Sequence, residues 1–185
     1  MQLGIQMAYY KLHHRFVSTY ESCSTAVYKH GRTETIRPVT NETKSFIETL
    51  TKSNDNQLKK DLLKKSSEKH QQLIKEAATG QGFDRHLFAL KYLQEMENKE
   101  ALHRIYKDKS YQLMNHTILS TSTVASKHIA AGGFGPVVND GFGIGYLIDD
   151  DQCGLLVSSY IPKELNNFMQ AAKESYEELA NIIKA

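Results

Sequence analysis

The chain has 185 residues, of which 40% are hydrophobic and 24% are charged, and its formal net charge at pH 7 is +2. This composition is typical of a globular chain that buries a core of its own, as one domain or as one half of a domain pair. Basic and acidic residues are nearly balanced, 23 against 21, so charge gives no argument for a nucleic-acid partner. The two cysteines, Cys23 and Cys153, are expected to be reduced thiols. The longest stretch without strongly polar side chains, residues 129–138, is roughly half of what a membrane-spanning helix needs.

Helix and strand patterns alternate in the first third of the chain. Residues 1–15 are dense in apolar side chains and lack an N-terminal cap, which is typical of the later turns of a helix. Residues 16–28 are rich in β-forming residues and predict a strand that runs into an exposed loop at residues 29–38. Thr40 is placed to cap a short helix that extends through Leu50.

Two helical patterns follow in the middle of the chain. From Asn56 to Thr79, apolar or small residues recur at helical spacing opposite a lysine-rich face, which predicts an amphipathic surface helix that ends at Gly80. The next helix is indicated by the apolar residues Phe83, Leu87, Leu90 and Leu93.

The last third predicts three strands and a final helix. The strands are expected at residues 113–124, 141–148 and 154–160, and the polar turn DDDQ joins the last two as a hairpin. The final helix follows Pro162. Helices that alternate with strands, together with a late antiparallel hairpin, predict an α/β fold in which helices flank a mixed sheet.

The glycine-rich segments GGFGPVV and GFGIG do not fit a dinucleotide-binding fingerprint. Gly141, Gly143 and Gly145 lack the sixth-position glycine, and a strand is expected to follow them. We interpret the segment as a loop that needs positive φ or a close approach of two backbones. The eight histidines show no metal-binding spacing, so no metal site is expected.

Several polar side chains are harder to explain as ordinary surface. Residues 20–25 place polar groups on a predicted strand, for which an edge strand is the simplest account. The following segment holds Arg32, Thr33 and Arg37 around a glycine and would suit an anionic ligand. Arg85 is a further candidate of this kind, and the alternative for it is an ion pair with Asp84 or a charge on a helix surface.

Together these segments resemble the choline/carnitine acyltransferase family. TYESCSTAVYKHGRTETIRP, GQGFDRHLFALKYL and LSTSTV followed by GGFGPVVNDGFGIGY match its C-terminal half in order and spacing, and the resemblance covers essentially all of residues 1–185. It implies a chloramphenicol-acetyltransferase-like fold and the C-terminal half of a two-domain acyltransferase. Within the family, the wording is most similar to the long-chain, palmitoyl-transferring mitochondrial members of the second, inner-membrane type.

The resemblance also implies a reaction and a set of site residues. Family members transfer acyl groups between coenzyme A and the hydroxyl of carnitine, with a histidine base, in fatty-acid oxidation. Coenzyme A or acyl-CoA is then a co-substrate, and no permanently bound cofactor is expected. An aromatic face suits the trimethylammonium group, and hydroxyls with a cation suit the carboxylate. The implied residues are Tyr20, Ser22, Thr33 and Arg85 for the carboxylate, Phe134 for the trimethylammonium group, and Ser122 as oxyanion donor.

One departure from the family pattern is large. None of the eight histidines is followed by Asp four residues later, as the fold superfamily requires of its catalytic base. The base, the lysine-containing coenzyme A segment and the membrane-associating insert belong to the N-terminal half of the family. Residues 1–185 are therefore expected to be inactive alone. The resemblance further implies a location on the matrix side of the mitochondrial inner membrane. Any association with the membrane is expected to occur only through the N-terminal half. The alternative is a non-catalytic carnitine-binding module that lacks the base.

Overall fold

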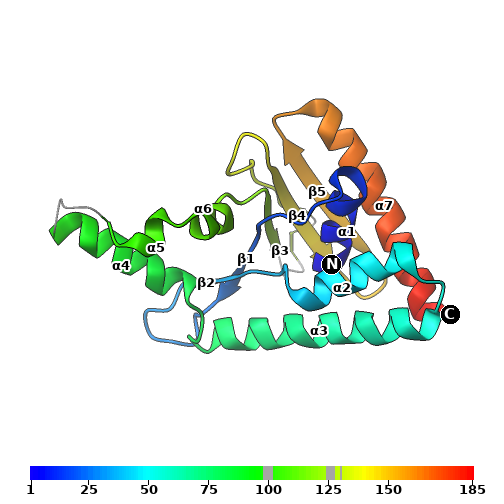
Figure 1. The fold of residues 1–185 in the computed structure, drawn as a ribbon, viewed down its shortest axis with the longest axis horizontal. Coiled ribbons are helices and arrows are strands. Elements are labelled where there is room, and N and C mark those ends of the chain that lie inside the picture. The colour runs from blue at the N-terminus through cyan, green and yellow to red at the C-terminus, as the bar shows by residue number, and fades with distance from the viewer. Residues whose placement is uncertain (98–101, 124–127, 130) are drawn as a thin grey trace.

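The computed structural model describes residues 1–97, 102–123, 128–129 and 131–185 (Figure 1). Its helices are α1 (Gln2–His13), α2 (Asn41–Lys52), α3 (Asn56–Ala78), α4 (Asp84–Glu97), α5 (Arg104–Lys107), α6 (Lys109–Asn115) and α7 (Pro162–Lys184). Its strands are β1 (Thr19–Ser24), β2 (Thr33–Ile36), β3 (Leu119–Thr123), β4 (Phe142–Ile148) and β5 (Cys153–Ser159).

The strands form one sheet with the order β2-β1-β3-β4-β5. The three inner strands β1, β3 and β4 run parallel, whereas β2 and β5 pair antiparallel at the two edges. Parallel neighbours need a long crossover, and α2 to α6 lie in the one that leads from β2 to β3. This topology confirms the predicted α/β fold with a mixed sheet and flanking helices, and also the predicted β4–β5 hairpin.

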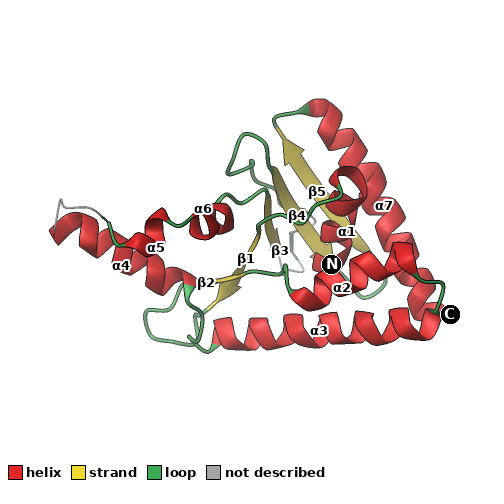
Figure 2. Cartoon of the chain, in the orientation of Figure 1, coloured by secondary structure: helices red, strands yellow, loops and turns green. Residues whose placement is uncertain are grey.

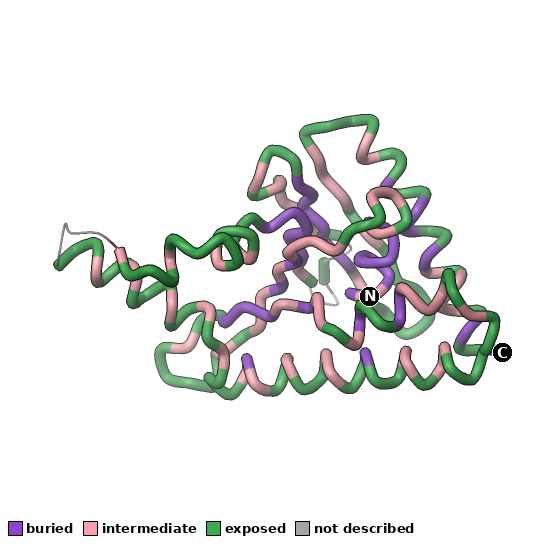
Figure 3. Tube along the Cα trace, in the orientation of Figure 1, coloured by how far each residue is buried: buried purple, intermediate pink, exposed green. Residues whose placement is uncertain are grey.

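Helices cover one face of the sheet and bury the main core. Figure 3 shows the buried residues concentrated in the inner strands and in α1. α1 and α7 pack together over β3 and β4, while α3 contacts β1 and β2. The main cluster comprises Ile5, Ala8, Tyr9, Ile118, Leu119, Phe142, Ile144, Tyr146, Phe168, Ala171 and Ala172. A smaller cluster between α1, α2 and α7 comprises Met7, Phe46, Ile47 and Ile182.

Local signals set several helix ends as predicted. The hydroxyl oxygen of Thr40 accepts a hydrogen bond from the backbone N–H of Thr43 at 3.2 Å and caps α2. After α3, Gly80 adopts a φ of 73°, the left-handed conformation that ends many helices. Pro162 begins α7, where its missing N–H costs nothing.

The structure corrects three predictions near the start of the sheet. The strand expected over residues 16–28 is limited to β1, because the chain turns after Ser24. The exposed loop expected over residues 29–38 contains β2, which pairs with β1 as a hairpin from Glu21↔Ile36 to Ser24↔Thr33. β2 is therefore the edge strand, and β1 lies inside the sheet between β2 and β3, so the edge-strand account of the polar residues 20–25 is wrong as well.

The strand expected over residues 113–124 is also shorter than predicted. Its first residues end helix α6, and the strand begins only at Leu119. Leu113 is 59% exposed, so its apolar side chain is not a strand-core residue. Val124, the predicted end, lies outside the described residues.

Helices α4 to α6 extend away from the layered body (Figures 1 and 2). No residue of α4 is buried. Its large exposed side chains are Phe88, Leu90, Tyr92, Leu93 and Met96. In the part of the chain that the structure describes, no helix has the length and apolar character required to cross a membrane.

Candidate substrate site on one face of the sheet

Strand alternation divides the side chains of the sheet between two faces. Because paired residues of neighbouring strands point to the same side, the register fixes which side chains share a face. We call the side under α1, α3 and α7 the helix face; its residues include Thr19, Glu21, Leu119 and Thr121. We call the other side the loop face; its residues include Tyr20, Ser22, Ser120 and Ser122.

Three of the predicted carboxylate-binding residues meet on the loop face. The guanidinium Nη2 of Arg85, in the first turn of α4, lies 3.2 Å from the hydroxyl oxygen of Tyr20. The same nitrogen lies 3.5 Å from the hydroxyl oxygen of Thr33, on the edge strand β2. The arrangement joins β1, β2 and α4 around one exposed cation. A guanidinium flanked by hydroxyls can bind an anionic group.

The two predicted serines lie on the same face. Ser22 is half-buried on β1, opposite Thr35 of β2. Ser122 is half-buried on β3, opposite Gly145 of β4. The hydroxyl of Thr121, between Ser120 and Ser122, points to the helix face. It is fully buried there, donates to the backbone oxygen of Tyr20 and accepts from Gln2, both at 2.7 Å.

Phe134 lies on a loop that rests directly on β4. The backbone oxygen of Phe134 accepts a hydrogen bond from the Ser158 hydroxyl. A Cβ atom added to Gly143 would lie 2.3 Å from that same oxygen, and one added to Gly145 would lie 2.0 Å from the backbone oxygen of Gly132. These glycines therefore permit a close approach of two backbones. Among the described glycines, positive φ occurs only at Gly80. Of the two reasons offered for the glycines of this segment, the close approach of two backbones therefore applies, and positive φ does not.

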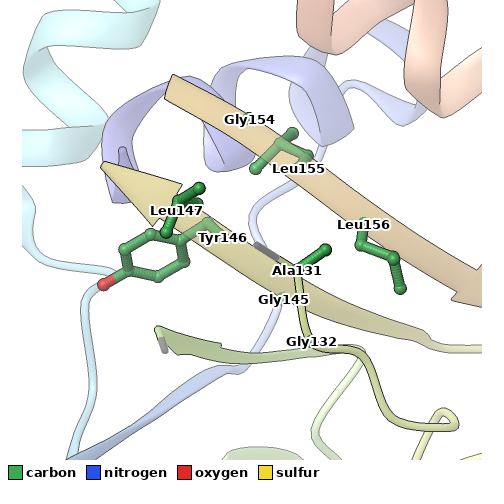
Figure 4. A pocket seen from close by; sticks show the side chains of 8 residues that line it. All are labelled: Ala131, Gly132, Gly145, Tyr146, Leu147, Gly154, Leu155 and Leu156. Carbon is green, nitrogen blue, oxygen red and sulfur yellow. The ribbon is translucent and has the colours of Figure 1, made fainter. Parts of the chain in front are cut away.

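A small apolar cavity lies between this loop and the β4–β5 hairpin (Figure 4). Its volume is about 140 Å³. Leu155 and Leu156 approach it from β5, and the loop closes it from the other side (Figure 4). The lining residues are Ala131, Gly132, Gly145, Tyr146, Leu147, Gly154, Leu155 and Leu156.

Buried ionisable groups lie on the opposite, helix face. The Tyr146 hydroxyl donates to the carboxylate of Glu21, which is 5% exposed, and His70 Nε2 lies 3.6 Å from the other oxygen of that carboxylate. Burial, and then the Glu21 carboxylate, raise the pKa of Tyr146. Burial lowers the pKa of His70, against the opposing effect of Glu21. Sequence reasoning missed this cluster, since its members are distant in the chain.

Arg37 has a different role from the one predicted. Its guanidinium is bonded to Asp84 at 2.8 Å and does not face an anionic ligand. The described residues show no ion pair between Arg85 and Asp84, so that alternative for Arg85 is wrong, although Arg85 does lie exposed on the surface of α4. Within the described residues, no group of three or more His, Cys, Asp or Glu side chains is arranged to hold a metal ion.

Comparison with known proteins shows which family the chain is similar to. The family model described as Choline/Carnitine o-acyltransferase matches residues 1–181. Carnitine O-palmitoyltransferase 2, mitochondrial, from Xenopus tropicalis is 45% identical over 99% of this chain and 28% of the relative. The human protein of the same name is 43% identical over the same shares. The putative mitochondrial carnitine O-acetyltransferase of Saccharomyces cerevisiae is 37% identical over 100% of this chain and 27% of its own length.

The chain thus spans little more than a quarter of the length of these relatives, and its match to the family model leaves only its last residues uncovered. The family model covers nearly all of the chain, and the relatives named above match 99–100% of it. The chain belongs to the choline/carnitine O-acyltransferase family.

Proposed function

We propose that residues 1–185 form the C-terminal part of a carnitine O-acyltransferase of the long-chain, palmitoyl type, and that they supply its carnitine-binding side. The observation that carries the proposal is the Arg85 guanidinium held between the hydroxyls of Tyr20 and Thr33 on the loop face. This face also presents Ser22 and Ser122. The names of the relatives support carnitine as substrate and, for the most similar ones, palmitoyl as the acyl group.

Arg85 binds the carboxylate of carnitine. Charge-assisted hydrogen bonds from a guanidinium to a carboxylate are roughly twice as strong as neutral ones. The hydroxyls of Tyr20, Ser22 and Thr33 complete the anion site and replace the hydration that the carboxylate loses. Arg85 is exposed in the structure, so a bound acyl-CoA or the N-terminal half must exclude water before these bonds reach full strength.

Phe134 contacts the trimethylammonium group at the other end of carnitine. A quaternary ammonium has no N–H to donate, so it is recognised by an aromatic face. The loop that carries Phe134 rests on Gly143 of β4, two strands away from β1. The charged ends of carnitine are therefore held from opposite sides of β3, with its hydroxyl between them.

Ser122 stabilises the oxyanion formed in the reaction. The carnitine hydroxyl oxygen attacks the thioester carbonyl of acyl-CoA while the histidine base, contributed by the N-terminal half, takes the hydroxyl proton. The carbonyl oxygen becomes the oxyanion to which the Ser122 hydroxyl donates. The C–S bond then breaks, the coenzyme A sulfur receives the proton, and acylcarnitine is released. Coenzyme A is a co-substrate in this scheme, not a resident cofactor.

The apolar cavity beside the Phe134 loop suits part of the acyl chain. Its lining is dominated by glycine and leucine, and it lies next to Gly145, the β4 partner of Ser122. An acyl group bound at Ser122 would therefore have apolar surface within reach. In line with the mitochondrial relatives, we place the enzyme in fatty-acid oxidation at the matrix side of the inner membrane, with membrane association through its N-terminal half.

The decisive experiment compares residues 1–185 alone with the full-length enzyme, by which we mean these residues preceded by the N-terminal part that supplies the histidine base. The full-length enzyme is expected to transfer palmitoyl groups from palmitoyl-CoA to carnitine. The shorter chain is expected to show no turnover, because a general base alone contributes about 10²–10⁴ in rate. Turnover by residues 1–185 that is abolished by replacing one of their histidines would contradict the proposal. Carnitine binding by the full-length protein without turnover would favour a non-catalytic module.

A further inference from the structure

We propose that Glu34, Arg37 and Asp84 are positioning residues that hold the first turn of α4 on β2 and thereby aim Arg85 at the carnitine carboxylate. The inference rests on the proposed function of Arg85. None of the three side chains contacts the substrate in our scheme. They affect carnitine binding only by fixing the position of Arg85. Glu34 lies in β2, Arg37 directly follows β2, and Asp84 is the first residue of α4.

The first attachment is a buried ion pair. Arg37 directs both Nε and Nη2 at Asp84 Oδ2, each at 2.8 Å. The side chains are only 17% and 10% exposed. Arg37 Nη1 also donates to the backbone oxygen of Met114 at 2.9 Å and to the hydroxyl of Ser18 at 3.2 Å. The guanidinium thus joins the start of α4 to the chain before β1 and the end of α6, with little donor capacity left for a ligand.

The second attachment is a carboxylate cap on α4. Glu34 is 7% exposed, and its Oε1 accepts hydrogen bonds from the backbone N–H of Arg85 at 3.2 Å and of Thr35 at 2.6 Å. An anionic group at a helix N-terminus also interacts favourably with the helix dipole. A Cβ atom at Gly82 would lie 2.3 Å from Glu34 Cγ, so the chain entering α4 passes directly over this side chain.

These two attachments matter because α4 has little else to hold it. No residue of the helix is buried, so apolar packing does not fix its direction. Further along, the Tyr106 hydroxyl donates to the backbone oxygen of Leu87, but Tyr106 itself belongs to the protruding α5. The position of the first turn therefore sets the position and direction of the Arg85 side chain. Small misplacements of a binding group are costly in enzymes, even when its charge is retained.

The test replaces Asp84 by Asn in the full-length enzyme, which keeps the shape of the side chain and removes its charge. We expect the carnitine KM to rise about threefold to twentyfold, less than for Arg85→Ala, because Arg85 keeps its charge but loses its placement. The KM for palmitoyl-CoA should stay within about twofold, since the altered contact concerns the carnitine carboxylate. Asp84→Glu restores the charge and is expected to recover part of the carnitine affinity. The Arg85 amide proton should exchange faster in Asp84→Asn than in the wild type.

The control is Phe168→Leu, on the helix face and far from α4, compared at a similar loss of thermal midpoint. A carnitine KM that rises equally in this control would show that Asp84 acts only through stability and would overturn the inference. So would an unchanged carnitine KM in Asp84→Asn while Arg85→Ala still raises it. If the wild type does not use carnitine, or Arg85→Ala leaves the carnitine KM unchanged, the proposed function or site fails, and this inference fails with it.

Discussion

The helix face and the loop face belong to one sheet but differ in their side chains: large apolar residues pack on the first, and hydroxyls and glycines line the second. On the helix face, Leu119 and Ile144 are at most 1% exposed, and Phe142 stacks on Phe168 with ring centroids 4.7 Å apart. On the loop face, the half-buried hydroxyl of Ser122 on β3 lies beside Gly145 on β4, where a loop backbone approaches closely. Because side chains alternate along a strand, the same strands serve both purposes. Single substitutions should therefore separate stability from substrate recognition.

The largest expected effect is on the helix face. Phe168 is fully buried, so Phe168→Ala should lower the free energy of unfolding by about 3–5 kcal/mol through lost packing and an unfilled cavity. The carnitine KM of the enzyme that remains folded should stay within about twofold of the wild type. Urea denaturation followed by far-ultraviolet circular dichroism measures the free energy of unfolding. Steady-state kinetics at low temperature measures the carnitine KM. A tenfold change in KM would break the separation of the faces.

Ser122→Ala tests the loop face through the chemical step. If the hydroxyl meets the oxyanion and not the resting substrate, kcat should fall by about 10²–10³ while the carnitine KM changes little. Thr121→Val, one residue earlier on the helix face, is the matched control. It should reduce stability, because Gln2 loses its acceptor, yet lower kcat by less than about tenfold. Steady-state kinetics of both variants decide the matter, and equal losses of kcat would contradict the assignment.

Arg85→Ala tests the loop face through ground-state binding. Loss of charge-assisted bonds costs about 1.5–3 kcal/mol, so the carnitine KM should rise roughly tenfold to a hundredfold. The KM for palmitoyl-CoA should not follow. Arg85→Lys retains the charge but not the planar fork and should fall between the two. If Arg85→Ala lowers the thermal midpoint and leaves the carnitine KM unchanged, the residue is only a surface cation that supports α4.

Phe134 tests the opposite end of the same ligand. Phe134→Ala should weaken carnitine binding by about 0.5–2 kcal/mol, the range of one cation–π contact, whereas Phe134→Tyr should be mild because the aromatic face remains. Carnitine titration monitored by calorimetry gives the dissociation constants directly. Equal affinity of the Ala and Tyr variants would show that the ring does not meet the cation.

The smallest expected effect is the response of the helix face to pH. Because burial lowers the pKa of His70 below its usual 6.5, the unfolded chain binds this proton more readily than the folded one. The contribution of neutral His70 to stability is therefore complete above about pH 6.5 and is lost as the pH falls below it. The neighbouring charged groups are the Glu21 carboxylate, which opposes this shift, and the amino group of Met1, which adds to it. Between pH 7.5 and 5.5, His70→Gln should lose less of its thermal midpoint than the wild type, and equal losses would contradict this.

Long periodic segments were predictable from the sequence, and short polar ones were not. The lysine-rich face and Gly80 indicate α3 because both signals act within one helix. β2 was missed because its four residues, TETI, stand in a polar segment and become a strand only by pairing with β1. The first residues of the strand expected before Leu119 end α6, where the apolar side chain of Leu113 remains exposed. Tertiary pairing outweighs local propensity at these places.

The candidate site was predictable in its residue types but not in its supports. The family resemblance led to Arg85, and the structure brings it to Tyr20 and Thr33. Nothing in the sequence indicated that Arg37 pairs with Asp84 or that Glu34 caps α4, because these contacts span 47 and 51 positions. Thr121 could have been assigned to the helix face from strand alternation alone, once the bounds of β3 were known.

The middle position of β3 has a consequence for how the ligand could change in evolution. Two of the side chains that we assign to the carnitine carboxylate, Tyr20 and Ser22, lie on β1, and Phe134 lies over β4. These strands are separated by two strand spacings, about 10 Å. That distance is set by backbone hydrogen bonds, which point substitutions leave in place. If carnitine binds as proposed, single substitutions can change which chemical group is recognised at either end. The strand spacing keeps the distance between the two ends, and so the length of a ligand that fits, unchanged.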